Sequence, residues 1–72
     1  MTTLLTNADK LNIVNQHMKS IDFQVYNLQL DLIEANAESP VNSETVATLT
    51  GRINVLNAKR VALESEAETL ED

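Results

Sequence analysis

The chain is poor in the residues that build many small functional sites. It has no cysteine, one glycine, one proline and one histidine. Without cysteine it can form no disulfide and no thiolate metal site, and its redox compartment stays undetermined. The single Gly51 excludes a glycine-rich loop of the kind that cradles phosphate groups. We therefore expect neither a disulfide scaffold nor a nucleotide-binding loop.

Basic residues are also scarce. Five Lys and Arg residues stand against eleven acids, which gives a formal net charge of −6. Binding of DNA or RNA depends on clustered Lys and Arg, so we expect no nucleic-acid partner. Membrane surfaces attract helices through the same basic side chains, so we expect no membrane partner either.

Long apolar runs are missing. The longest contain two or three residues, far short of the roughly 20 needed to cross a bilayer. The amino terminus has no basic segment followed by an apolar stretch, which is the pattern of a secretion signal. These features predict a soluble, cytoplasmic protein, or one of the host cytoplasm or of a larger particle if the source is viral.

The chain does contain two heptad series that match each other backwards. Apolar residues recur at alternating steps of three and four, the spacing that keeps one seam of a helix against a partner helix. The first series includes Leu4 and is continuous from Leu11, and the second runs from Val46 to Leu70 with Arg60 as its one polar member. When the chain folds back near Pro40, the layers are Ala35 with Val46, Leu32 with Leu49, Leu28 with Ile53, Val25 with Leu56, Ile21 with Arg60, Met18 with Leu63, Val14 with Ala67, and Leu11 with Leu70. In every layer the two residue numbers sum to 81, so the register is constant.

This register predicts an all-α protein, a single antiparallel two-helix hairpin over residues 1–72. We expect a first helix at about 7–37, a turn at about 38–42 and a second helix at about 43–70. Pro40 ends the first helix because its ring removes an amide donor and restricts the preceding residue. A lone hairpin of this size has a small core, so an oligomer or another partner is expected to add stability.

Capping residues are present at both predicted helix starts. Thr6 or Asn7 suits the first helix, because either side chain can accept a hydrogen bond from a free amide of the first turn. Asn42 or Ser43 suits the second helix in the same way. A start one turn earlier, at Ser39 followed by Pro40, is the competing interpretation.

Charges beside the seam agree with the register. At this register Asp31 is expected to face Arg52, His17 to face Glu66, and Asp22 to lie beside Arg60. Exposed pairs of this kind select register more than they stabilise. Arg60 is expected to lay its methylene stem along the seam and carry its guanidinium to water or to Asp22. The alternative is a buried polar residue that fixes the number of partner chains.

A second apolar series lies on the side of the first helix away from the seam. We call it the outer stripe, and its members are Phe23, Tyr26, Leu30, Ile33 and Ala37. At the same height, the outer side of the second helix carries a small-residue face, made of Ala47, Gly51, Val55, Ala58 and Ala62. A helix that is apolar on two opposite sides is normally buried on both.

These two surfaces predict protein interaction. The candidate interface residues are Phe23, Tyr26, Leu30, Ile33, Gly51, Val55 and Ala58. Self-association is the favoured interpretation, with two hairpins forming a four-helix bundle in which aromatic residues of one helix pack on small residues of another. A different protein partner is the alternative, since an exposed apolar patch on a soluble monomer marks an interaction site.

No group of residues indicates catalysis, a cofactor or a metal. The one histidine, His17, has apolar neighbours four residues away on either side, whereas metal sites need several convergent ligands. Two acidic groups at helical spacing could hold a divalent cation, but a solvated face is the favoured interpretation. These groups are Asp31, Glu34 and Glu38, and Glu64, Glu68 and Glu71. We expect no enzyme activity.

The leading function is therefore a non-catalytic oligomeric interaction or assembly module. The small size and the many Asn, Thr and Ser residues are compatible with an accessory or structural protein of a phage. The alternative is an acidic inhibitor or decoy that occupies a basic surface of a nucleic-acid-handling or host protein. Against this alternative, the acids alternate with lysines along much of the chain and concentrate only near its carboxyl end.

Overall fold

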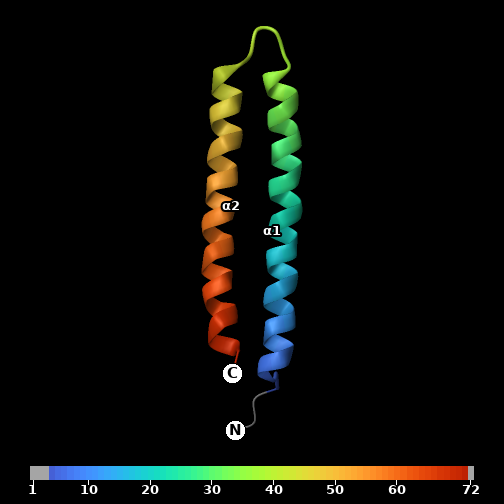
Figure 1. Ribbon diagram of the computed structural model, residues 1–72, viewed down its shortest axis with the longest axis vertical. Coiled ribbons are helices and arrows are strands. Elements are labelled where there is room, and N and C mark those ends of the chain that lie inside the picture. Colours follow the sequence, from blue (N-terminus) through green and yellow to red (C-terminus); the bar gives the residue numbers. More distant parts are fainter. Residues whose placement is uncertain (1–3, 72) are drawn as a thin grey trace.

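The computed structural model describes residues 4–71 and consists of two long helices that lie side by side and antiparallel (Figure 1). Helix α1 spans Asn7–Asn36 and helix α2 spans Ser43–Leu70. No strand occurs within residues 4–71. The rod measures 61 × 20 × 15 Å. The predicted all-α antiparallel helical hairpin is confirmed.

Reciprocal hydrogen bonds cap the start of α1. The backbone N–H of Asp9 donates to Thr6 Oγ1 at 3.1 Å, and the backbone N–H of Thr6 donates to Asp9 Oδ2 at 3.2 Å. This capping box satisfies amides that have no partner inside the helix. Leu4 lies before the cap and is 95% exposed, so its inclusion in the heptad series was wrong.

The turn ends α1 and starts α2 within a few residues. The helix stops at Asn36, one residue earlier than expected, and the N–H of Ala37 still donates to the carbonyls of Ile33 and Glu34. Asn42 then caps α2, since its Oδ1 accepts from the backbone N–H of Glu44 at 3.1 Å and of Thr45 at 3.2 Å. The competing start at Ser39 is not used, because Asn42 supplies the cap.

The core is a single seam between the two helices. All sixteen residues of the eight layers are buried or half-buried, and Lys10 is the one half-buried residue outside them within residues 4–71. Only Ile21, Ala35 and Ala67 count as buried hydrophobic residues in that part of the chain. The register predicted from the sequence thus matches the burial pattern. Because so few side chains are fully covered, the hairpin has little apolar burial of its own.

Candidate functional site

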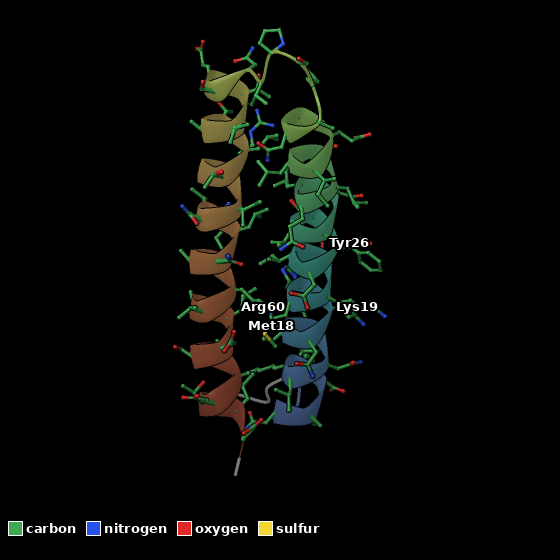
Figure 2. The ribbon with its side chains drawn as sticks, turned by 45° about the horizontal axis from the view of Figure 1, so that its top comes forward. Met18, Lys19, Tyr26 and Arg60 are labelled. Carbon is green, nitrogen blue, oxygen red and sulfur yellow. The ribbon has the colours of Figure 1, made fainter. Side chains whose placement is uncertain are left out.

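The outer stripe is the main candidate site, because its large side chains remain exposed. Phe23 is 62% exposed, Tyr26 60%, Leu30 40% and Ile33 65%. Tyr26 and Lys19 project from the side of α1 that faces away from α2 (Figure 2). The four large apolar residues recur at steps of three and four, so they form one continuous strip along the helix.

The exposed apolar area of the outer stripe is larger than that of apolar side chains scattered singly on a surface. A fully covered aromatic side chain buries about 150–250 Å², so Phe23 and Tyr26 at about six-tenths exposure each present on the order of 100 Å² or more to water. Leu30 and Ile33 extend this area toward the turn. Contiguous patches of this size mark interaction sites on soluble proteins.

The small-residue face lies along the other long edge of the hairpin. Its residues, Ala47, Gly51, Val55, Ala58 and Ala62, are all exposed. The seam register puts Gly51 level with Leu30, and Val55 level with Tyr26. The two surfaces nevertheless point away from each other, since each lies opposite the seam on its own helix. The structure therefore does not bring the two sets of candidate residues together within one chain.

An open groove of about 740 Å³ runs between the helices beside the small-residue face. Its lining residues are Gln24, Asn27 and Leu28 of α1 and Thr48, Gly51, Arg52, Val55 and Leu56 of α2. A Cβ atom added at Gly51 would meet no atom within 4 Å, so the missing side chain leaves open space. The groove thus joins Gly51 and Val55 of the small-residue face to polar residues of both helices.

Sequence reasoning missed Gln24, Asn27 and Thr48 as members of this groove. All three lie on the side of the seam where Gly51 leaves space. No pattern in the sequence points to them, because the groove depends on the shape of both helices together. Their polar groups lie at the rim of a groove whose exposed lining is otherwise mostly apolar.

Comparison of the chain with protein-family models, curated proteins and solved structures finds no match. The arrangement of its own residues therefore carries the functional argument.

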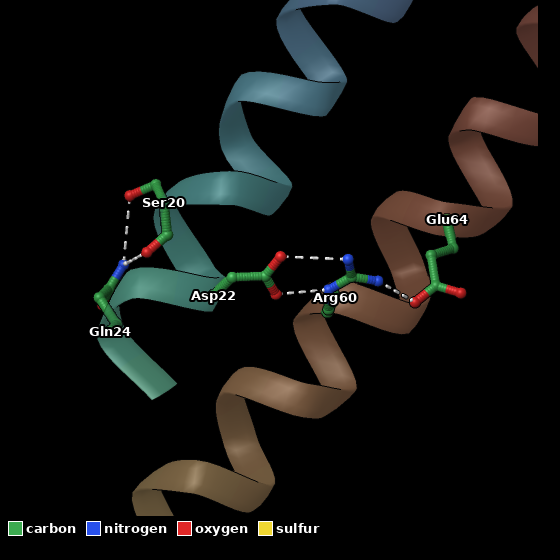
Figure 3. Close-up of polar contacts among 5 residues, drawn as sticks. All are labelled: Ser20, Asp22, Gln24, Arg60 and Glu64. Atoms are coloured by element: carbon green, nitrogen blue, oxygen red, sulfur yellow. Dashed lines mark hydrogen bonds and ion pairs between the residues drawn. The ribbon is translucent and has the colours of Figure 1, made fainter. Parts of the chain in front are cut away.

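One charged cluster crosses between the helices (Figure 3). Arg60 donates from Nε to Asp22 Oδ1 at 2.7 Å and from Nη2 to Asp22 Oδ2 at 3.2 Å. Its Nη1 donates to Glu64 Oε1 at 2.6 Å. The Arg60 side chain is 35% exposed, so it lies at the edge of the seam. The expected core-edge arginine that reaches Asp22 is confirmed.

We call the two-pronged contact of Arg60 with Asp22 the fork, and it shifts the pKa values of both groups. Hydrogen bonding to Arg60 lowers the pKa of the Asp22 carboxyl, and the charge of Arg60 acts in the same direction. Hydrogen bonds to Asp22 and Glu64 raise the pKa of Arg60. Both groups are therefore ionised at neutral pH. We assign the cluster to holding the helices in register, since its polar atoms satisfy one another.

The other two pairs expected to face each other behave differently. Within residues 4–71, no ion pair joins Asp31 to Arg52 or His17 to Glu66. These side chains are exposed, and holding two long exposed side chains together costs about as much entropy as the screened attraction returns. These two pairs therefore add no ion pair to the hairpin, and the register does not depend on them.

Metal ligands and membrane spans were also sought in the described part of the chain. Residues 4–71 contain no cluster of three or more His, Cys, Asp or Glu side chains placed to hold a metal ion. In the same range, neither helix has a stretch that is both long and apolar enough to cross a bilayer.

Proposed function

We propose that this chain is a non-catalytic protein interaction module that works as a homo-oligomer, with two hairpins assembling into a four-helix bundle. The observation that carries the proposal is the outer stripe, where Phe23, Tyr26, Leu30 and Ile33 expose 40–65% of their surface on one side of α1. The module would serve to join copies of the chain within a larger assembly.

Apolar burial gives the driving force. Covering apolar surface stabilises by about 25 cal/mol per Å², so each of the two aromatic side chains offers on the order of 2 kcal/mol on association. The seam of a single hairpin leaves few residues fully buried. Association therefore adds a second apolar layer to a molecule whose own core is thin.

Self-association is favoured over a different partner because of symmetry. When a surface packs against a copy of itself, one contact covers that surface on both chains. Symmetric homo-oligomers are also the commonest assemblies of soluble proteins.

Sedimentation velocity tests the proposal. The unmodified chain should sediment as a dimer or larger species, and Phe23→Asp or Leu30→Asp should shift it to monomer, because a charge is not tolerated in an apolar interface without a partner. Gln16→Asp is the matched control, since Gln16 has the same outward heptad position in the polar half of α1. It should leave the oligomer unchanged.

Two outcomes would contradict the proposal. A helical monomer at millimolar concentration would leave the outer stripe for a different protein. An oligomer that dissociates as salt rises would indicate charge attraction, which is screened over about 8 Å at physiological ionic strength, and would favour the acidic decoy.

A further inference from the structure

We propose that the second copy docks α1 against α1, antiparallel and about a two-fold axis, through the outer stripe. This inference rests on the self-association proposed above and specifies its geometry. The four helices then lie in a row, with α1 and its copy at the centre and the two α2 helices outside, in place of a closed bundle around one common core.

The spacing of the outer stripe is self-complementary. It repeats the seam pattern, with steps of three and four from Phe23 to Ala37. In the hairpin, antiparallel layers pair residues whose numbers have a constant sum, and the same geometry applied to two α1 helices gives a sum of 56. Phe23 then meets Ile33 of the second copy, and Tyr26 meets Leu30 of the second copy. The axis repeats both contacts, so every large member of the stripe is covered.

The ends of this interface are also complementary. The next layer outward pairs Lys19 with Ala37 of the second copy, so the lysine stem lies over a methyl group. Lys19 projects on the same side of α1 as Tyr26 (Figure 2). Ala37 caps the carboxyl end of α1, and the last turn of that helix has no basic residue of its own. A lysine from the second copy would supply the positive charge that this end of a helix favours.

Flanking side chains meet without like charges. At this register, the flanking pairs are Asn27 with Asn27, Gln29 with Gln29, Ser20 with Glu34, and Asp22 with Asn36, one residue from each copy. An amide carries both donors and an acceptor, so it can bond to its own symmetry copy. All of these positions are exposed in the single hairpin, and Asp22 keeps its hydrogen bonds to Arg60 of its own chain.

Other arrangements fit less well. A parallel pairing of α1 with α1 would put Lys19 against Lys19 in the layer beside Phe23, and like charges in one layer repel. Packing the outer stripe on the small-residue face is head-to-tail, because the two surfaces lie on opposite edges of the hairpin. A head-to-tail contact leaves one stripe uncovered in each dimer and continues into rings or filaments.

The covered area is adequate for a specific pair. Four large side chains from each copy bury on the order of 1,000 Å² in total, close to the lower limit for specific protein interfaces. The head-to-tail contact would bury less, since it replaces one set of large side chains with alanine and glycine.

Single-cysteine crosslinking tests the axis, and the natural absence of cysteine leaves no competing thiol. Gln29 lies at the axis, so Gln29→Cys should convert most of the chain to a covalent dimer with a short thiol crosslinker. Asn36 lies on the same side of α1 but opposite Asp22 of the second copy. Two copies of Asn36→Cys would therefore stand on the order of 20 Å apart at 1.5 Å per residue and should crosslink roughly tenfold less.

The controls separate this geometry from the proposed function. Gly51→Leu fills the small-residue face and should leave both crosslinking and the dimer unchanged. Efficient crosslinking at both cysteine positions would show a parallel pair, and none at Gln29→Cys in a chain that still sediments as a dimer would show another interface. Either result overturns the two-fold arrangement while self-association stands. A monomeric unmodified chain would contradict both the two-fold arrangement and self-association.

Discussion

Arg60 is the residue that distinguishes the observed register of the seam from registers shifted by one heptad. Four α1 residues flank the seam on its side, Asn15, Asp22, Gln29 and Asn36, and Asp22 is the only acid among them. A slip of one heptad would move Arg60 beside Asn15 or Gln29 and lose the two-pronged contact with a carboxylate. An apolar residue at position 60 would bury more area, but it would not distinguish these registers.

Direct titration of Asp22 tests the fork. The pKa of its carboxyl should lie below the ordinary value of 3.8 because Arg60 donates hydrogen bonds to the ionised form. In Arg60→Gln the pKa of Asp22 should rise toward the ordinary value. Carbon-13 NMR of the side-chain carboxyl measures both. Lys59→Gln removes an equal charge from the neighbouring residue and should leave the pKa of Asp22 unchanged.

The sign of the pH effect follows from the lowered pKa. Because the carboxyl is more acidic in the folded chain, its contribution to the free energy of unfolding is complete above the ordinary value of 3.8. The contribution is lost as the pH falls from that value through the folded pKa. If the Asp22 carboxyl resonance does not respond to Arg60→Gln, Arg60 and Asp22 do not contact each other in solution.

Gly51 is the weak point of α2 at the scale of the helix. A glycine inside a helix costs about 0.5–1 kcal/mol relative to alanine, and a Cβ at position 51 would meet no atom within 4 Å. Gly51→Ala should therefore raise the free energy of unfolding by about that amount, as measured by urea denaturation. Ala58→Gly, at another exposed position of the same face, is the matched control and should lower it similarly. Destabilisation by Gly51→Ala would reveal a close contact with another helix at this position.

The helices were predictable from the sequence to within a residue, for reasons specific to certain positions. Thr6 and Asn42 offer caps where the apolar spacing begins, and Pro40 interrupts it, so local and long-range signals agree. The constant sum of 81 gave the pairing, because one register matches every layer of the two heptad series. Ala37 was predicted to be the last residue of the first helix, but α1 ends at Asn36. The N–H of Ala37 still donates to carbonyls of the last turn, so the sequence does not distinguish the two end points.

The surface was predictable in part. The outer stripe could be found because Phe23, Tyr26, Leu30 and Ile33 share the spacing of a buried face without belonging to the seam. Whether His17 and Arg52 form ion pairs could not be predicted, since exposed side chains have many rotamers of similar free energy and charge alone does not choose among them. The groove at Gly51 depends on the shape of both helices together, which no single helix pattern contains.

At the scale of the whole molecule, the thin seam ties stability to concentration. If folding and association are coupled, the midpoint of thermal unfolding should rise by roughly a few degrees for a tenfold increase in chain concentration. Ile33→Asp should lower the midpoint and remove this dependence, because Ile33 belongs to the outer stripe and not to the seam. Circular dichroism at several concentrations measures both. A midpoint that stays constant for the unmodified chain would mean that the hairpin is stable alone.

The hairpin topology also decides how the molecule responds to mechanical force. The start of α1 and the end of α2 lie at the same pole of the rod (Figure 1), so tension applied at these two points separates the helices sideways. Each layer then carries the load in turn, from Leu11 and Leu70 inward, and the fork of Arg60 is reached after three apolar layers have opened. The rod therefore unzips in small steps rather than shearing along its length, and any tether acting at that pole opens it from the end farthest from the turn.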